Sequence, residues 1–297
     1  MKKFIVISAL FLSLAGCGNS VPELIDAEKS DKKLIIVTTL FPVYDFAKSV
    51  GGDMVEVTLL VPPGTEPHEY EPTASDIINI NNADVFAYTG GFMERWVPGI
   101  LGSVTNKNLE AVNMSEGTEI VEGDPHIWLD FDHDRIMVKN IADAIVRKNP
   151  ENKNYYEKNL EDLLSKIDKI DYDYKMTISL CKSKEIVYGG HYAFGYLVRK
   201  FGLGYIAAQG LSPDSEPTAK DLIELTNQVR KNSVEYIFYE ELASPKVAET
   251  ISNETGAEML LLNNLESLPR DEIASGKTFI DAMYENLNNI KTGLDCK

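Results

Sequence analysis

The sequence predicts an α/β fold in which two related lobes each carry a parallel β-sheet. Short apolar runs rich in β-branched residues alternate with segments of helical periodicity, an order typical of parallel sheets. The same order occurs twice, and residues 71–76 (EPTASD) return as residues 216–221 (EPTAKD) with five of six positions identical. Each copy opens a helical pattern with Thr-x-x-Asp, which resembles a capping box. We therefore expect two lobes built on one plan.

The first lobe is expected to span residues 32–150. Its first strand is the run LIIVTT, of the kind that is buried in a parallel sheet, and the helical pattern after it ends at Gly51 and Gly52. Pro62-Pro63-Gly64 closes the second strand. The expected elements of this lobe are strands at 34–39, 55–61 and 83–87 and a helix at about 74–81.

One long amphipathic helix is predicted between the lobes, over residues 151–180. Apolar residues recur there at spacings of three and four, with charged residues between them. At 1.5 Å per residue, about 28 residues span roughly 42 Å, enough to cross a two-lobed protein. Such a stiff connector would limit hinge motion. A helix buried within one domain is the alternative.

The second lobe is expected to span residues 181–297 and to repeat the first. The predicted elements are strands at 185–188 and 234–239 and helices at 192–200 and 219–231.

The N-terminus has the layout of an exported lipoprotein. Lys2 and Lys3 precede a short apolar run, and Leu14-Ala15-Gly16-Cys17 looks like a lipobox, in which the Cys becomes the first mature residue and carries a lipid. We expect residues 1–16 to be a removed signal peptide, Cys17 to be lipidated and residues 17–31 to be a polar tether. A plain signal peptide with a chance Cys is the alternative. The apolar run is too short for a spanning helix, and the remaining chain has no transmembrane candidate.

The two remaining cysteines, Cys181 and Cys296, would lie in an oxidising compartment and are expected to form a disulfide. It would tie the C-terminal tail to the start of the second lobe. Two free thiols that lie too far apart are the alternative.

The formal charge of −17 argues against a nucleic-acid partner. Phosphate binding needs a basic stripe, and the sequence contains no dense Lys/Arg cluster of that kind.

Three of the four histidines occur where α/β proteins present ligands. His68 lies in a Pro/Gly-flanked loop after a strand, His126 follows Pro125 and is close to Trp128, and His191 follows Gly189-Gly190 at the end of a strand. Taken singly, each could be structural. Together they are better explained as one site in the cleft between the lobes.

Three neutral imidazoles suit a borderline-soft divalent ion, above all Zn²⁺. Carboxylates near His126 could orient its ring. His133 has charged neighbours at an apparent helix start, so we interpret it as a solvated surface residue.

Several motifs resemble those of the zinc/manganese solute-binding lipoproteins of bacterial ABC importers, the zinc-uptake type in particular. The resemblance extends over essentially the whole mature chain. The matching segments are residues 38–47 (TTLFPVYDFA), 64–76 (GTEPHEYEPTASD), 124–130 (DPHIWLD), 189–203 (GGHYAFGYLVRKFGL), 237–257 (IFYEELASPKVAETISNETGA) and 283–287 (MYENL).

The resemblance implies two α/β lobes joined by a long helix and a single divalent metal in the cleft, held by His68, His126 and His191. It also implies delivery of that metal to a membrane permease with its cytoplasmic ATPase. The protein would be a non-enzymatic monomer, anchored by lipid to the outer face of the bacterial cytoplasmic membrane.

Three departures from the family pattern matter. Manganese members usually carry Glu at the position of His191, so zinc is favoured and manganese is the alternative. The stretch 110–123 is short and has no His, so it cannot gather metal as a His-rich loop would. Some family members have a carboxylate as the fourth ligand, and the matching position here is Lys277. The fourth ligand is then either water or Glu240, which stands at the end of a predicted strand. A solvated Glu240, or one that only supports a ligand, is the alternative.

Two other functions remain open. Three protein ligands plus water also describe a catalytic zinc site, although the chain has no HExxH motif for a hydrolase. Surface lipoproteins can also act as adhesins, but no surface in the sequence is singled out for that role.

Overall fold

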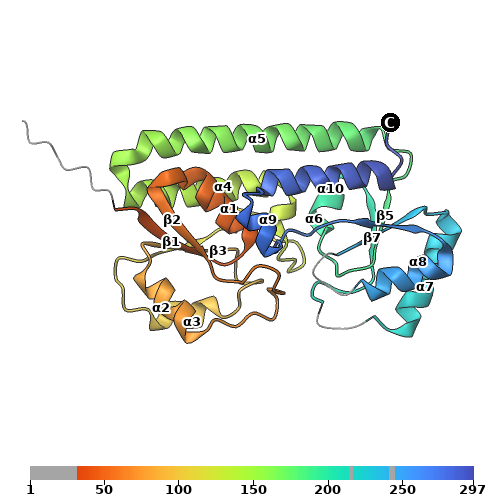
Figure 1. Ribbon diagram of the computed structural model, residues 1–297, viewed down its shortest axis with the longest axis horizontal. Helices are drawn as coiled ribbons and strands as arrows, with labels where there is room; N and C mark the ends of the chain where they lie inside the picture. Colours follow the sequence, from red (N-terminus) through yellow and green to blue (C-terminus); the bar gives the residue numbers. More distant parts are fainter. Residues whose placement is uncertain (1–31, 214–216, 241–244) are drawn as a thin grey trace, which may run out of the picture. The chain divides into compact units, whose positions relative to one another are not determined.

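Two four-stranded parallel sheets form the framework of the protein (Figure 1). The computed structural model describes residues 32–213, 217–240 and 245–297, and residues 33–297 form one compact unit. The predicted signal peptide, the lipidated Cys17 and the tether lie outside the described residues. Within the described part of the chain, no helix is long and apolar enough to cross a membrane.

The first sheet has the strand order β2-β1-β3-β4, and all its pairs are parallel. Its strands are β1 (Leu34–Thr38), β2 (Val55–Leu59), β3 (Val85–Tyr88) and β4 (Glu110–Asn113). The registers pair Ile36 with both Val57 and Val85, so β1 is flanked on both sides. This central position explains its continuous β-branched sequence, because a strand covered on both faces has no solvent-facing positions.

The second sheet repeats this arrangement, with the order β6-β5-β7-β8 and parallel pairing throughout. Its strands are β5 (Glu185–Tyr188), β6 (Gly204–Ala207), β7 (Tyr236–Tyr239) and β8 (Glu258–Leu261). In each sheet the first strand in sequence pairs with the second and the third, so the two lobes share one topology. The predicted fold class is confirmed. Strands β4, β6 and β8 were not predicted, because each is a four-residue segment with a weak apolar pattern.

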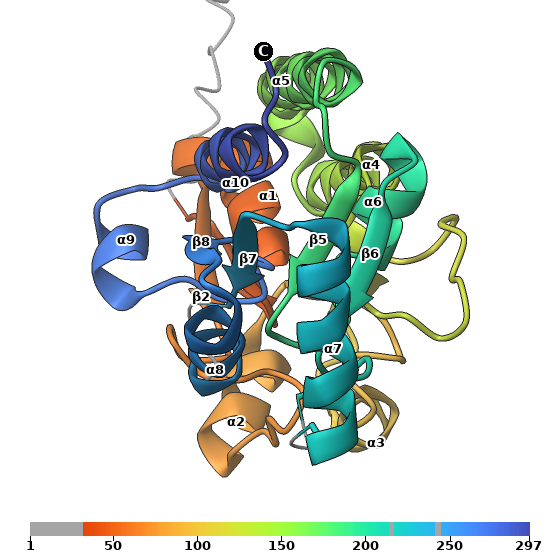
Figure 2. The same cartoon turned by 90° about the vertical axis from the view of Figure 1, so that its right-hand side faces the viewer.

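The helices cover the faces of the two sheets and carry the chain between strands (Figures 1 and 2). They are α1 (Phe41–Gly51), α2 (Ala74–Asn82), α3 (Val97–Ser103), α4 (Phe131–Lys148), α5 (Lys153–Ser179), α6 (Gly195–Phe201), α7 (Ala219–Asn232), α8 (Lys246–Thr255), α9 (Arg270–Ala274) and α10 (Phe279–Gly293). Single 3₁₀ turns occur at Gly52–Met54, Ile127–Leu129 and Pro150–Asn152.

The phrase shared by the two lobes starts equivalent helices. Thr73 and Thr218 are the N-caps of α2 and α7, and each forms a complete capping box with the Asp three residues later. A third capping box, between Thr278 and Asp281, opens α10. A capping box gives hydrogen-bond partners to two backbone N–H groups that would otherwise have none at the start of the helix. The residue at which the helix begins is therefore well defined.

The long helix is confirmed as α5, which buries its apolar stripe. Tyr156, Leu163, Ile167 and Ile170 are at most 4 % exposed. α10 lies beside α5 in both views, and the hydroxyl of Tyr174 on α5 donates to the carbonyl oxygen of Met283 at 2.7 Å (Figures 1 and 2). The predicted disulfide joins Cys181, just after α5, to Cys296, just after α10.

The chain also crosses between the lobes a second time, after β8. The backbone N–H of Phe41, at the start of α1, donates to the carbonyl oxygen of Glu266 at 3.3 Å. The ring of Phe279 packs edge-on against Phe46, with the centroids 5.0 Å apart. Residues 262–278 therefore reach the first lobe, and α10 begins there and runs back to the disulfide beside the second lobe, a connection that periodicity alone did not predict.

His133 is not the solvated residue that the sequence indicated. It lies in the first turn of α4, is 8 % exposed, and packs against the ring of Tyr196 with the centroids 5.1 Å apart. The acidic neighbours suggested an exposed helix start. The N-terminal turn of α4 is instead covered by α6, which buries this face of the helix.

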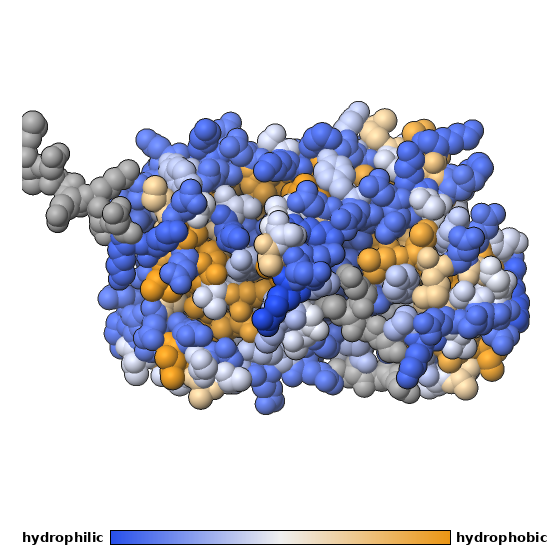
Figure 3. All heavy atoms as spheres, in the orientation of Figure 1, coloured by the Kyte–Doolittle hydropathy of each residue, from blue (hydrophilic) through white to orange (hydrophobic). Residues whose placement is uncertain are grey.

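Polar residues cover most of the face seen in Figure 3, with apolar residues gathered in patches between them. This surface agrees with the composition of the chain, in which 25 % of the residues are charged.

Candidate metal centre

His68 lies in the loop between β2 and α2. The backbone N–H of His68 donates to Oε1 of Glu66 at 3.0 Å, and that of Tyr70 donates to the carbonyl oxygen of Pro67 at 3.1 Å. Prolines at positions 62, 63, 67 and 72 restrict the backbone of the same loop. The imidazole is therefore presented by a segment with little conformational freedom.

His126 caps the 3₁₀ turn that precedes α4. Its backbone N–H donates to Oδ1 of Asp124 at 3.0 Å, and the same oxygen lies 2.6 Å from Nδ1 of its ring. Trp128 is fully buried against the imidazole, and its indole N–H donates to the carbonyl oxygen of Asn264 at 2.7 Å. Asp124 therefore fixes the ring so that Nε2 is the free nitrogen.

His191 follows β5 and the pair Gly189-Gly190. Nδ1 of His191 lies 3.0 Å from Oε2 of Glu240, which follows β7, the neighbouring strand of the same sheet. A Cβ atom at residue 190 would lie 2.6 Å from that carboxylate oxygen, so only glycine lets Glu240 approach. The other oxygen of Glu240 accepts a hydrogen bond from the side-chain amide of Asn264 at 2.7 Å. Glu240 thus contacts Nδ1 of His191 and leaves Nε2 of that ring for the cluster.

Glu266 completes the cluster, and sequence reasoning missed it. Its Oε1 atom lies 3.0 Å from Nε2 of His68, 2.9 Å from Nε2 of His126 and 3.3 Å from Nε2 of His191. Lys277, the position that the resemblance matched to a fourth ligand, lies in ion pairs with Glu272 and Glu285. The signal that could have found Glu266 is its place shortly after a strand, but that strand, β8, was itself not predicted.

The structure brings together the three histidines that the sequence singled out. One ligand atom from each histidine and one from Glu266 all lie within 4.8 Å of one another. The side chains of His126 and His191 are 0 % exposed, that of Glu266 is 2 % exposed and that of His68 is 8 % exposed. These four residues are called the His₃Glu cluster below. Its members come from four separate loops: two of the first lobe, one of the second, and the segment after β8 that crosses between the lobes.

The electrostatics of the cluster favour a bound cation. Burial alone would raise the pKa of Glu266, but the charge of His191 and hydrogen bonds with the imidazoles hold that pKa well below its usual range. Burial would lower the pKa of His191, yet Glu266 and Glu240 raise it well above the ordinary value. Without a metal, protons on imidazole therefore balance the buried carboxylates. A divalent cation would take the place of those protons.

Glu66 adds a further carboxylate beside the cluster. Burial and the charge of Glu266 raise the pKa of Glu66 to about 7. Oxygens of Glu66, Glu240 and Glu266 lie within 4.8 Å of one another. The site therefore combines three nitrogen donors with an oxygen-rich border.

Three imidazole nitrogens and one carboxylate oxygen are a donor set that suits tetrahedral Zn²⁺. Mn²⁺ prefers sites with more oxygen ligands. All four donors come from protein side chains, so the arrangement resembles a closed binding site more than a catalytic one, which keeps a position for water.

Comparison with known proteins agrees with this geometry. Residues 36–293 match the family described as zinc-uptake complex component A, periplasmic. The chain is 40 % identical to the high-affinity zinc uptake system protein ZnuA of Bacillus subtilis, over 97 % of this chain and 96 % of that protein. It is 38 % identical to the zinc-binding lipoprotein AdcA of Streptococcus pneumoniae, over 99 % of this chain but only 62 % of that longer relative.

A solved structure gives the same result. The Zn(II)-bound ZnuA-like domain of AdcA from Streptococcus pneumoniae superposes with a TM-score of 0.80 at 40 % identity, covering 89 % of this chain and all of that domain. The resemblance stated from the sequence motifs is confirmed.

Proposed function

Because the chain belongs to the zinc-uptake complex component A family, we propose that it captures Zn²⁺ outside the cell and delivers it to the membrane permease of an ABC importer. The observation that carries this proposal is the His₃Glu cluster, in which four buried donor atoms converge from loops of both lobes. No turnover is required of such a protein. Its task is to bind tightly and then to release.

We propose His68, His126, His191 and Glu266 as the zinc ligands. Asp124 and Glu240 support this assignment, since each contacts Nδ1 of an imidazole and leaves Nε2 free for the metal. Carboxylate partners of this kind also raise the basicity of the ligand. Glu240 is then a positioning residue rather than a ligand.

The distribution of the ligands suggests how the metal could be released. His68 and His126 belong to loops of the first lobe, and His191 follows β5 of the second. Glu266 lies in the segment after β8, whose backbone is hydrogen-bonded to Phe41 of the first lobe. A small separation of the lobes would therefore move His191 away from the other donors and leave zinc with an incomplete set. We propose that contact with the permease, powered by its ATPase, produces this separation.

Zinc is favoured over manganese as the transported ion because the donor set is rich in nitrogen. Manganese remains the alternative cargo, and the carboxylates of Glu66 and Glu240 would have to join the site to favour it. A zinc hydrolase is disfavoured because four protein donors leave no open position for a substrate or a reactive water.

We propose that the mature protein is a monomer held at the outer face of the cytoplasmic membrane by a lipid on Cys17. The lipobox-like sequence Leu14-Ala15-Gly16-Cys17 supports this anchor. Two acyl chains would retain the protein stably at the membrane, where one would not.

The test is a competition titration of metal-free protein, residues 18–297, with zinc and with manganese. We expect one tightly bound zinc ion and much weaker manganese binding. His191→Ala and Glu266→Ala should each weaken zinc binding strongly, whereas His133→Gln, at the one histidine outside the cluster, should not. Unchanged zinc affinity in both cluster variants would contradict the ligand assignment. Tighter manganese than zinc binding would contradict the metal.

A further inference from the structure

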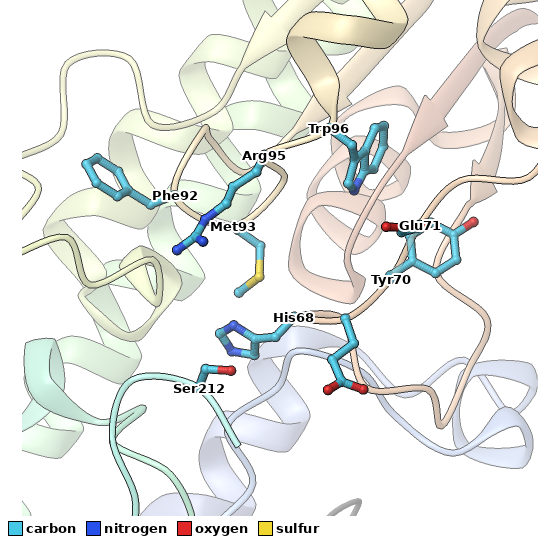
Figure 4. A pocket seen from close by; sticks show the side chains of 9 residues that line it. His68, Tyr70, Glu71, Phe92, Met93, Arg95, Trp96 and Ser212 are labelled. Atoms are coloured by element: carbon cyan, nitrogen blue, oxygen red, sulfur yellow. The ribbon is translucent and has the colours of Figure 1, made fainter. Parts of the chain in front are cut away.

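The three imidazoles of the His₃Glu cluster are held in different ways. Nδ1 of His126 contacts Asp124 and Nδ1 of His191 contacts Glu240, whereas Nδ1 of His68 has no hydrogen-bond partner among the described residues. His68 instead borders a cavity of about 380 Å³, whose lining residues are shown in Figure 4. Two of the three candidate ligands therefore depend on a carboxylate, and the position of that carboxylate matters for the metal.

Asp124 closes a tight turn that comes directly before His126. Its backbone N–H donates to the carbonyl oxygen of Val121 at 2.9 Å, and the two residues between them, Glu122 and Gly123, have φ angles of 53° and 78°. Glycine adopts such a left-handed conformation readily, but a glutamate does so only at a cost in free energy. Contacts from outside the turn must therefore stabilise it.

Tyr196, in the first turn of α6, supplies such contacts at both ends of the turn. Its hydroxyl oxygen accepts a hydrogen bond from the backbone N–H of Val121 at 3.1 Å, and the hydroxyl donates to the carbonyl oxygen of Asp124 at 3.0 Å. Tyr196 is 2 % exposed, so these hydrogen bonds form away from bulk water, where they are stronger. One hydroxyl group therefore fixes the residue whose carboxylate contacts His126.

Gly195, the residue before Tyr196, lets α6 approach the same carboxylate. A Cβ atom at residue 195 would lie 2.7 Å from Oδ2 of Asp124, which is closer than real Cβ atoms come. Oδ2 is buried and has no hydrogen-bond partner in the described part of the chain, so packing against α6 limits where this oxygen can lie. Oδ1 is thereby kept toward the imidazole of His126, 2.6 Å from Nδ1.

These contacts cross from one lobe to the other. α6 follows β5 of the second lobe, whereas the turn and His126 belong to the first. The ring of Tyr196 also packs against His133 of α4, with the centroids 5.1 Å apart, and the guanidinium carbon of Arg199 lies 5.2 Å from the centroid of the same ring. The hydroxyl is therefore presented to the turn in one orientation.

We propose that Tyr196 and Gly195 are positioning residues for zinc binding: they fix the turn at 121–124, and through Asp124 they orient His126 so that Nε2 points at the metal. A ligand of the first lobe is then in its binding orientation only while α6 of the second lobe contacts the turn. A separation of the lobes that moves α6 would remove this support at the same time as the histidine of the second lobe moves away. This inference rests on the proposed function, because it concerns the same zinc site.

The experiment measures zinc affinity by competition with a zinc-binding dye. Tyr196→Phe removes the hydroxyl and keeps the ring, and we expect it to lower zinc affinity about 5-fold or more, since direct loss of a partner that orients a ligand costs about 10- to 100-fold. Tyr174→Phe is the matched control, because it removes another buried hydroxyl, which donates to the carbonyl oxygen of Met283 at 2.7 Å between α5 and α10. Its zinc affinity should equal that of the wild-type protein.

A double-mutant cycle separates positioning from a general loss of structure. If Tyr196 acts through Asp124, Tyr196→Phe should change zinc affinity less than about 2-fold when Asp124→Ala is already present. Gly195→Ala, which keeps the hydroxyl, should also lower zinc affinity by displacing Asp124. In zinc-loaded protein with isotope-labelled histidine, Asp124→Ala should remove one Nδ1 proton resonance, which should shift in Tyr196→Phe and stay in place in Tyr174→Phe.

Wild-type zinc affinity in Tyr196→Phe, an unchanged Nδ1 resonance in that variant, or fully additive effects of Tyr196→Phe and Asp124→Ala would each overturn the inference. Unchanged zinc affinity in Gly195→Ala would do the same, even if Tyr196→Phe did not fold. Tight zinc binding by the wild-type protein in the same series would show that the proposed function stands regardless. Its absence would contradict the proposed function itself, and this inference with it.

Discussion

Oε2 of Glu240 lies 3.0 Å from Nδ1 of His191, and Asn264 donates to the other oxygen of the same carboxylate at 2.7 Å. Glu240 therefore holds the ring of His191 through Nδ1. Asn264, which belongs to the same segment as Glu266, holds the carboxylate of Glu240 in place. This chain of contacts links β5, β7 and the loop after β8, so the orientation of His191 depends on residues remote in sequence.

Removing the charge at Glu240 should weaken zinc binding without abolishing it. We expect Glu240→Gln to lower zinc affinity about 10- to 100-fold, because the carboxylate orients His191 and raises its basicity. Competition titration with a zinc-binding dye measures the change. Glu235→Gln, at an exposed residue five positions earlier, is the control and should have no effect. An affinity unchanged by Glu240→Gln would argue against a positioning role.

Zinc should stabilise the folded protein, because the four donor atoms of the His₃Glu cluster are brought together only by folding. At a free concentration 100 times the dissociation constant, zinc should raise the free energy of unfolding by about 2.7 kcal/mol. Differential scanning calorimetry should record a higher melting temperature, and removal of zinc with a chelator should reverse the increase. Glu266→Ala should show a much smaller increase at the same zinc concentration. Equal increases in both proteins would contradict the site.

The stability of the metal-free protein should depend on pH through Asp45. Burial raises the pKa of Asp45 to about 6 from an ordinary value of 3.8, even though the carboxylate accepts a hydrogen bond from the backbone N–H of Phe279 at 3.0 Å. The folded state therefore holds the proton more tightly than the unfolded chain does. The contribution of Asp45 to stability is complete below about pH 4 and is lost as the pH rises through about 6, by about 3 kcal/mol at most.

Asp45→Asn isolates this effect, because an amide oxygen can still accept the hydrogen bond from Phe279 but does not titrate. Denaturant unfolding at pH 4.5 and at pH 7.5 should show that the variant gains stability relative to wild type as the pH rises. A difference between the two proteins that does not change with pH would be incompatible with a buried, titrating Asp45.

Loss of the disulfide should cost stability but not zinc affinity. Cys181 and Cys296 are 115 residues apart in sequence, and closing a loop of that length contributes about 4 to 5 kcal/mol by the chain-entropy estimate. The bond joins the chain just after α5 to the chain just after α10, whereas the donors of the His₃Glu cluster lie in loops at the ends of strands. We expect the Cys181→Ser/Cys296→Ser variant to unfold at a lower denaturant concentration while binding zinc normally in the absence of denaturant. A large loss of zinc affinity in folded variant protein would show that the two regions are coupled.

Local patterns predicted most of the first sheet and the long helix. The run at residues 34–39 became the central strand β1, and the apolar spacing after Asn152 became α5, because both depend on a periodicity that neighbouring residues share. The repeated phrase at 71–76 and 216–221 correctly indicated two equivalent helix starts. Short edge strands such as β8 were missed, since four residues give too little pattern to recognise.

The sequence by itself determined the α/β class, the repeated lobes, the family, the disulfide pair and the three histidines at the ends of loops and strands. Each of these depends on residue types at short range, on a count of cysteines or on motifs in a set order. Only the tertiary structure decided that Glu266 joins the histidines, that Glu240 orients one of them, that His133 is buried and that Tyr196 of α6 contacts the turn before His126. These facts depend on which distant segments pack together, and the return of residues 262–278 to the first lobe brings Glu266 within 3.3 Å of all three Nε2 atoms.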